Sequence, residues 1–327
     1  MKTNKVNLKR ILPILLSLSI LLLFTSCNAN NKTSEANNTT SEVNTQAVSN
    51  PAESVSPAQE TDFTYTIAGG KAQITEYKGA GGVVKIPSSL GGAPVTSIGA
   101  NAFIRCSKLT NVSIPQGVTS IGTFAFLGTG LASITIPQGV TNIDSGAFSN
   151  CSSLTSVNIS QGVTNIDSTA FGSCYSLTNI KVANDNLNYK SIDGVLYNKA
   201  GTTLIECPAG LTTLSIPKGV TSIGYGAFYF CRGLTTIGIP EGVTSIGGRA
   251  FTYCSSLTTV TIPQSVTSIG DRAFSTCTKL TSIIIPQGVT SIGDEAFDSC
   301  KSLKISCVKN SYAEGYAKTN GIPYQTL

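Results

Sequence analysis

The residues of this sequence best suited to chemistry are its ten cysteines. Most of them occupy one position of a recurring sequence unit: Cys106, Cys151, Cys174, Cys231, Cys254, Cys277 and Cys300. Stacking of the units would align these side chains in an inward ladder, where a thiol acts as a small apolar group. Neighbouring members could come within disulfide distance, but parallel side-chain directions disfavour the geometry of that bond. We predict buried thiols, with some disulfides or a bound metal as the alternatives.

The second unit carries Gly128 at the ladder position. Cys207 and Cys307 lie outside the ladder, and their separation along the chain argues against a disulfide between them. Histidine is absent, which excludes imidazole acid–base catalysis and histidine metal sites.

Acidic residues are scattered, and several follow a turn of the unit: Asp144, Asp167, Asp271, Asp294 and Glu295. On stacked units they could resemble a glycosidase acid pair or a calcium site. We favour the alternative, that they are solvated turn residues or helix caps. The sequence contains neither a phosphate-binding loop nor a dinucleotide fingerprint. We therefore predict no enzymatic activity, no metal and no cofactor.

An internal repeat must position all of these residues. Phenylalanine follows alanine at positions 103, 126, 148, 171, 228, 251, 274 and 297. The intervals are 23, 22, 23, 57, 23, 23 and 23 residues, so one unit is a residue short and one interval holds 34 extra residues. Such regularity predicts a solenoid, in which every unit buries its faces against its neighbours.

The unit LTSIIIPQGVTSIGDEAFDSCKS, from Leu280 to Ser302, has a direct physical interpretation. Ile283 and Ile285 alternate with exposed positions, as in a strand with one buried face. Pro286 lacks an N–H group and ends the strand. The Ala-Phe pair and the ladder cysteine have helical spacing, which predicts a short helical turn on the other side.

The exposed positions of the predicted strands form a candidate binding face. Its members are Ser113, Thr135, Asn158, Lys181, Ser215, Thr236, Thr259, Thr261, Ser282 and Ile284. This face lacks the Tyr, Trp and Arg side chains typical of tight protein contacts, so we expect weak or multivalent binding there. Alternatively, these residues serve only strand formation and solubility.

A second candidate surface is aromatic. Tyr225, Tyr229, Phe230 and Tyr253 lie near one another on successive units. Because a ring offers an apolar face and tyrosine adds a hydroxyl, such a group could stack against a sugar. Tyr229 and Tyr253 are the candidate glycan platform.

The repeat resembles the BspA-like leucine-rich repeats over about residues 63–327. Leu280, Ile283 and Ile285 follow an L-x-x-L-x-L spacing, and a glycine such as Gly288 after the Ile-Pro pair stands where many leucine-rich repeats have asparagine. The resemblance implies a leucine-rich-repeat solenoid with a parallel β-sheet on one face and short helical turns on the other. It also implies a bacterial surface protein linked to adhesion and protein binding.

Both ends of the array need caps, because a solenoid exposes apolar terminal coils. Two alternating runs around Gly69-Gly70 predict an N-terminal β-hairpin. Ser311 and Glu314 fit a capping box and Gly321 a helix stop, which predicts a C-terminal helix over about 312–320. The inserted residues, about 183–210, predict a hairpin with its turn near 198–201. That hairpin is either a spacer, which we favour, or a projecting binding loop.

The N-terminal residues have the pattern of an export signal. Residues 1–26 combine four basic residues with an apolar stretch from Ile11 to Phe24, too short for a spanning helix. The Thr25-Ser26-Cys27 sequence resembles a bacterial lipobox, which implies lipidation of Cys27; the alternative is an ordinary signal peptide. Removal of 1–26 lowers the formal charge from +5 to +1, since 18 basic residues then face 17 acidic ones. Residues 27–61 read as a disordered tether, and residues 62–327 as the repeat domain.

Together these features predict a monomeric surface protein, lipid-anchored to the membrane on the extracellular face of the envelope. Its expected role is adhesion or another interaction with a host or bacterial surface or matrix protein. The alternative is binding of glycan or cell wall. Nothing in the charge pattern favours nucleic acid as a partner.

Overall fold

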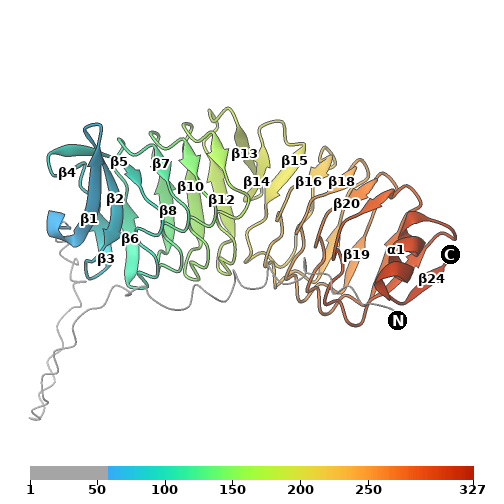
Figure 1. Ribbon diagram of the computed structural model, residues 1–327. Coiled ribbons are helices and arrows are strands. Elements are labelled where there is room, and N and C mark those ends of the chain that lie inside the picture. Colours follow the sequence, from blue (N-terminus) through green and yellow to red (C-terminus); the bar gives the residue numbers. More distant parts are fainter. Residues whose placement is uncertain (1–57) are drawn as a thin grey trace, which may run out of the picture.

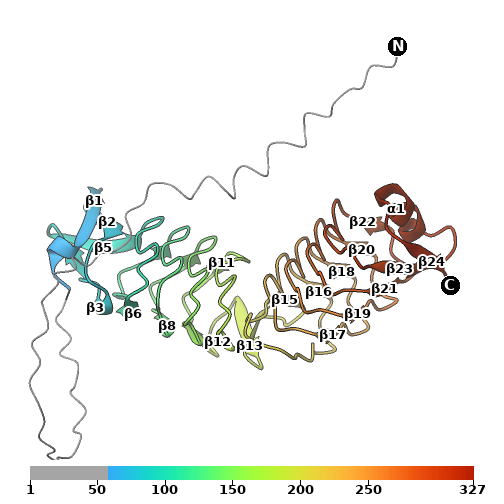
Figure 2. The same ribbon diagram turned by 90° about the horizontal axis from the view of Figure 1, so that it is seen from below.

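The computed structural model describes residues 58–327, which form a curved array of stacked coils (Figures 1 and 2). The predicted signal peptide, Cys27 and nearly all of the predicted tether lie outside these residues. In the described part, no helix has the length and apolar character that crossing a membrane requires. The array bends near its middle, at β13 (Tyr189–Ile192), with one arm of coils on either side (Figure 2).

One side of the array carries a row of parallel strands, most of them at the positions predicted from the alternating pattern. In the N-terminal arm they are β3 (Gly82–Lys85), β6 (Leu109–Ser113), β8 (Ser133–Ile136), β10 (Ser156–Ile159) and β12 (Asn179–Val182). In the C-terminal arm they are β17 (Thr236–Gly238), β19 (Thr259–Thr261), β21 (Ser282–Ile285), β23 (Lys304–Cys307) and β24 (Tyr324–Thr326). Val157, for example, lies in parallel register between Ile134 and Ile180. The predicted solenoid with its parallel sheet is confirmed.

A second row of parallel strands runs along the other side. In the N-terminal arm these are β5 (Ala93–Ile98), β7 (Ser120–Ile121), β9 (Asn142–Ile143) and β11 (Asn165–Ile166). In the C-terminal arm they are β16 (Ser222–Ile223), β18 (Ser245–Ile246), β20 (Ser268–Ile269) and β22 (Ser291–Ile292). A threonine before each short strand adds a hydroxyl bond between coils: Thr244 Oγ1 donates to the Thr221 carbonyl at 3.2 Å, and Thr267 Oγ1 to that of Thr244 at 3.1 Å.

The Ala-Phe segment differs from the predicted short helical turn. It forms single turns, and the Phe251 N–H donates to the Ala273 carbonyl of the next coil at 2.6 Å. Residues two before and two after the phenylalanine have positive φ in most coils, as Arg249 (55°) and Tyr253 (64°) do. Left-handed residues cannot continue a right-handed helix, so the N–H groups pair with the neighbouring coil instead.

The phenylalanines form two buried stacks. Phe103, Phe126, Phe148 and Phe171 lie with successive ring centroids 4.7–5.6 Å apart. Phe228, Phe251, Phe274 and Phe297 repeat the arrangement at 4.7–5.4 Å. The hydrophobic core is divided in the same way into two clusters, which meet at β14 (Val195–Asn198).

The inserted residues explain this division. They form β13, β14 and β15 (Thr203–Glu206), paired antiparallel in that order, and β15 then pairs in parallel with β16. The Cys207 N–H donates to the Ala227 carbonyl at 2.7 Å, a bond that phenylalanine makes in the regular coils. The inserted coil thus has Glu206-Cys207 where its neighbours have Ala-Phe, and the stack of rings stops there.

Each end of the array is covered by an irregular element. At the N-terminus, β1 (Phe63–Ala68) and β2 (Lys71–Tyr77) form the predicted hairpin, preceded by a 3-10 turn (Glu60–Asp62), while β4 (Ser89–Leu90) pairs with β5. At the C-terminus, α1 (Tyr312–Asn320) begins at Ser311, whose side chain accepts from the Glu314 N–H, and ends at left-handed Gly321. The Glu314 carboxylate reaches the Asn310 N–H rather than completing the capping box with Ser311.

Candidate functional site

The cysteine ladder lies inside the array, as expected. Cys151, Cys174, Cys231, Cys254, Cys277 and Cys300 are buried free thiols, and so are Cys207 and Cys307 outside the ladder. Cys106 is also buried but is disulfide-bonded, so the prediction of a free thiol is wrong there and the alternative of a disulfide holds. Most ladder thiols donate to the phenylalanine carbonyl of the preceding coil, as Cys254 does to Phe228 at 3.1 Å. Burial raises the pKa of the Cys254 thiol, so it stays protonated and able to donate. The ladder therefore has a structural role.

One ladder position was assigned wrongly from the sequence. Thr129, not Gly128, stands there in the second unit, with its hydroxyl 3.1 Å from the Cys151 sulfur. The missing residue of this short unit falls after Thr129, so counting back from the next leucine shifts the alignment by one. Like a thiol, the threonine hydroxyl can donate a hydrogen bond, so the ladder position keeps a hydrogen-bond donor in this unit as well.

The acidic turn residues make hydrogen bonds and ion pairs within and between the turns. Asp167 accepts from the Thr169 N–H and hydroxyl, and Asp271 accepts from the Asp294 N–H at 3.0 Å. Glu295 forms an ion pair with Arg272 at 2.7 Å. Among residues 58–327, no group of three His, Cys, Asp or Glu side chains could hold a metal ion.

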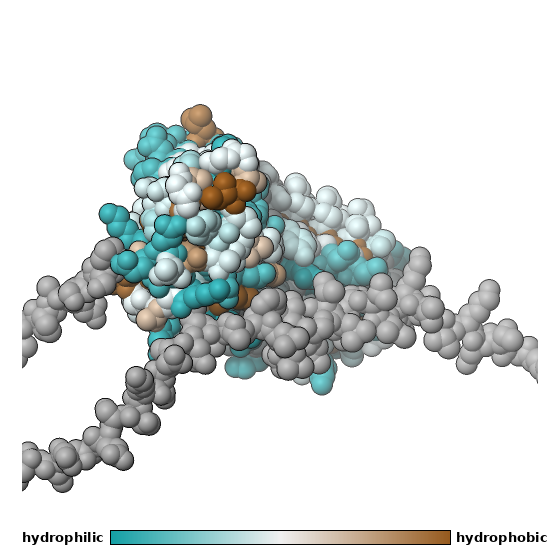
Figure 3. Space-filling model, turned by 60° about the vertical axis from the view of Figure 1, so that its left-hand side comes forward, coloured by the Kyte–Doolittle hydropathy of each residue, from teal (hydrophilic) through white to brown (hydrophobic). Residues whose placement is uncertain are grey.

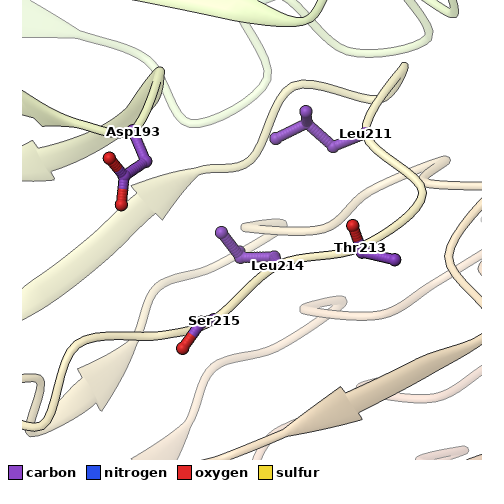
Figure 4. A pocket seen from close by; sticks show the side chains of 5 residues that line it. All are labelled: Asp193, Leu211, Thr213, Leu214 and Ser215. Atoms are coloured by element: carbon purple, nitrogen blue, oxygen red, sulfur yellow. The ribbon is translucent and has the colours of Figure 1, made fainter.

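The polar strand face is exposed but not continuous. Each of its ten predicted residues, from Ser113 to Ile284, lies exposed on the strand side. At the bend, β12 and β17 do not pair, and Ser215 makes only an isolated bridge to Gly238. A shallow cavity of about 450 Å³ opens there, between Asp193 of the β13–β14 turn and the irregular segment from Leu211 to Ser215 (Figure 4). The bend thus divides the predicted face in two.

Aromatic residues gather on the ridge formed by the Ala-Phe turns. The Phe230 ring stacks on that of Tyr253 at 4.4 Å, and the Tyr229 ring lies 6.1 Å from Tyr253. The Arg232 guanidinium lies 5.1 Å from the ring centroid of Tyr175 and 4.9 Å from that of Phe230. We call Tyr175, Phe230, Arg232 and Tyr253 the aromatic ridge. The sequence predicted the proximity of the tyrosines and Phe230, but not Tyr175 or Arg232.

The backbone of the aromatic ridge is strained. Phe230 and Tyr253 have φ of 63° and 64°, a conformation that large side chains rarely adopt. The equivalent position of other coils holds Gly128 and Asn150, which adopt it more readily, and also Arg105, Ser173, Thr276 and Ser299. Two rings therefore stand on backbone in a sparsely populated conformation, a feature that clusters at functional sites.

A separate pocket lies where turns from the two arms come together. The aromatic side chains that line this pocket are Phe124, Tyr225 and Tyr229. Its polar side chains are Ser145, Ser149, Thr169 and Arg249. We call this cavity, of about 190 Å³, the bend pocket. Of the two residues of the predicted glycan platform, Tyr229 lines this pocket, whereas Tyr253 belongs to the aromatic ridge beside it.

Two buried polar atoms lie near the bend without a partner among the described residues: the Tyr197 hydroxyl and Glu206 Oε2. Burial raises the pKa of both groups, although the Phe171 N–H lowers that of Glu206. Burial in the core therefore favours the neutral acid form of Glu206.

The described residues of the N-terminal cap show no large apolar surface in the view of Figure 3. In the view of the N-terminal cap, the described surface is mostly teal and white, and brown is confined to small separate patches (Figure 3). Ile67 and Val83 are the large apolar residues of this cap that are exposed. Scattered apolar residues of this kind are normal for a soluble surface.

Fold and surfaces together define a class of protein: a β-solenoid of short repeats whose candidate sites lie along its coils. The chain belongs to the BspA-type leucine-rich repeat family. The family model described as "BspA type Leucine rich repeat region (6 copies)" matches residues 84–199 and 204–315. No curated protein matches the sequence.

Several solved structures are similar to this chain. A leucine-rich repeat protein from Eubacterium ventriosum is 26% identical with a TM-score of 0.51, over 74% of this chain and 68% of that one. The pneumococcal vaccine antigen PcpA is 17% identical with a TM-score of 0.50, over 83% and 98%. A leucine rich cell surface protein from Faecalibacterium prausnitzii is 25% identical with a TM-score of 0.43, over 80% and 96%. The likeness to PcpA concerns the fold alone.

Proposed function

We propose that this protein is a monomeric binding module, displayed on the outside of a bacterial cell by a lipid on Cys27, which attaches to a protein partner. Residues 1–26 resemble an export signal that ends in a lipobox, which supports anchoring. Membership of the BspA-type repeat family supports a role without catalysis.

The observation that carries the proposal is the aromatic ridge. Tyr and Arg side chains are enriched in the small group of residues that dominates protein interfaces. The Phe230 ring contacts both the Tyr253 ring and the Arg232 guanidinium, so these large groups are already ordered before a partner arrives. Ordered side chains lose less entropy on binding than free ones do. Arg232 has no acidic partner among the described residues and keeps its donors for a partner.

The polar strand face has a secondary part in this proposal. Its small side chains provide little apolar area, so each contact there adds little affinity. Repetition along both arms would allow several weak contacts with an extended or repetitive partner. The aromatic ridge would then supply the anchor and the strand face the additional contacts.

A direct test measures binding of the immobilised protein to matrix proteins, serum proteins and purified cell-wall glycans. We expect saturable binding to a protein. The double variant Phe230→Gly, Tyr253→Asn should lose it, because both rings disappear while the left-handed backbone is accommodated. The matched control, Thr259→Lys with Thr261→Lys on the strand face, should bind more weakly but still measurably.

Two outcomes would refute the proposal. Full binding by the ridge variant would remove the aromatic ridge as the anchor. Binding to glycans alone, with no protein retained, would replace a protein partner by a carbohydrate one.

A further inference from the structure

The bend pocket owes its existence to the inserted coil. That coil has Cys207 instead of phenylalanine and lacks the regular Ala-Phe turn, so the turns of the flanking coils approach each other. The Tyr229 ring lies close to Gly172, where a Cβ would be in ordinary contact with it at 3.5 Å. The Phe124 ring covers Gly146 more tightly, because a Cβ on Gly146 would overlap it. Bare backbone at Gly146 therefore gives the Phe124 ring its place beside the cavity.

The size of the bend pocket limits its occupant. A cavity of about 150 Å³ is enough to hold a benzene molecule, and the bend pocket measures about 190 Å³. One six-membered ring fits, and a peptide helix or a nucleotide does not. Three aromatic side chains around it favour a ligand with at least one apolar face.

The hydroxyl groups on one wall have a defined direction. The Asp167 carboxylate can only accept, so the Thr169 hydroxyl, 2.7 Å away, donates to it. The Ser145 hydroxyl, 3.0 Å from that of Thr169, must then donate to Thr169. Ser149 donates to the Thr169 carbonyl at 3.0 Å. Both serines have used their hydrogens, so they offer the pocket acceptor lone pairs that suit a ligand's hydroxyl donors.

Arg249, in contrast to the two serines, offers hydrogen-bond donors and a positive charge to the pocket. Among residues 58–327 its side chain has no ion pair and no hydrogen bond, and the same holds for the hydroxyls of Tyr225 and Tyr229. Arg272 occupies the equivalent position one coil later and is paired with Glu295. An unpaired guanidinium in a partly enclosed site favours an anion, and it matches a carboxylate in two-point geometry.

We propose that the bend pocket binds a single acidic pyranose, that is, a sugar ring carrying a carboxylate, as in a hexuronic acid unit of a polysaccharide. The apolar face of the sugar stacks on the aromatic side chains, its hydroxyls donate to Ser145 and Ser149, and its carboxylate pairs with Arg249. This inference stands apart from the protein partner of the aromatic ridge, since Tyr229 and Arg249 are not ridge residues.

The test compares glucuronate with glucose, two probes that differ only by the carboxylate at one carbon. Binding to the intact protein is measured by calorimetry and by saturation-transfer NMR. We expect glucuronate to bind at least about tenfold more tightly than glucose, the ratio that one charge-assisted bond of about 1.5 kcal/mol gives.

Two variants and one control locate the site. Arg249→Gln should reduce glucuronate affinity at least about tenfold and abolish the preference over glucose. Tyr229→Thr should weaken both sugars; it copies Thr252, the equivalent residue one coil later, whose hydroxyl bonds the Arg272 carbonyl. The control Arg272→Gln removes a guanidinium from the same coil position outside the pocket and should bind like the parent.

The outcomes separate cleanly. Equal affinity for glucuronate and glucose, or unchanged glucuronate affinity in Arg249→Gln, would overturn the proposal. Loss of affinity in Arg272→Gln as large as in Arg249→Gln would overturn it too, because the effect would then be one of overall charge. Failure of Tyr229→Thr to fold would leave the Arg249 comparison to decide.

Discussion

Replacement of Phe230 by glycine and by alanine should separate the strain in its backbone from the value of its ring. Both changes remove the ring, with its contacts to Tyr253 and Arg232. Only glycine also relieves the left-handed conformation, which costs other residues about 1–2 kcal/mol. The ring contacts are worth about 0.5–1.5 kcal/mol for the stacked pair and about 0.5–1 kcal/mol for the cation–π contact.

We therefore expect Phe230→Gly to lie within about 1 kcal/mol of the parent in free energy of unfolding, with Phe230→Ala about 1–2 kcal/mol less stable than the glycine variant. Urea denaturation followed by circular dichroism measures both. Thr259, on strand β19, is the matched control, because in an ordinary strand glycine is less stable than alanine by about 0.5–1 kcal/mol. If alanine equals or exceeds glycine at Phe230, the strain argument is wrong.

Three further predictions concern the core. Phe251→Leu should lower the free energy of unfolding by about 2–3 kcal/mol, because two stacked contacts, at 4.7 and 5.0 Å, disappear with the ring; urea denaturation checks this, and a loss below about 1 kcal/mol would contradict it. Cys254→Ala should be less stable than Cys254→Ser by about 1 kcal/mol in the same assay, because serine can still donate to the Phe228 carbonyl. Equal stabilities of the two variants would show that the hydrogen bond from the thiol adds no stability. Glu206→Gln should raise the melting temperature at neutral pH. The raised folded pKa of Glu206 means that its neutral form is the stable one in the core, so the parent loses stability as pH rises above the unfolded value of about 4.3, and the gain of the variant should vanish near pH 4.

The repeat period was enough to predict the solenoid, the parallel strands of one side and the two caps, but not the second row of short parallel strands. It did so because each strand position is fixed by a buried residue, as Ile283 and Ile285 are in β21. The same logic failed at the Ala-Phe turns. Their spacing is that of a helix, yet the backbone pairs with the next coil, and only the asparagines and glycines scattered at the left-handed positions hinted at that.

The candidate sites were predictable only in part. Tyr229, Phe230 and Tyr253 are close in sequence register, and stacking brings them together. The bend pocket also needs Phe124 and Ser145, from coils on the far side of the insertion. Their approach to Tyr229 depends on the bend that the inserted coil produces, and a repeat pattern carries no information on such an angle.

The bend also determines how the two arms of the array are oriented relative to each other. Every regular coil touches mainly the coils before and after it, so rotation at the inserted coil moves a whole arm as one piece. A small change of angle near β14, where the two core clusters meet, becomes a large displacement at α1 or at the β1–β2 hairpin. The span between the two ends of the molecule therefore depends on the angle at this one coil as well as on the number of coils in each arm, and whole units added to an arm would lengthen it without changing that angle.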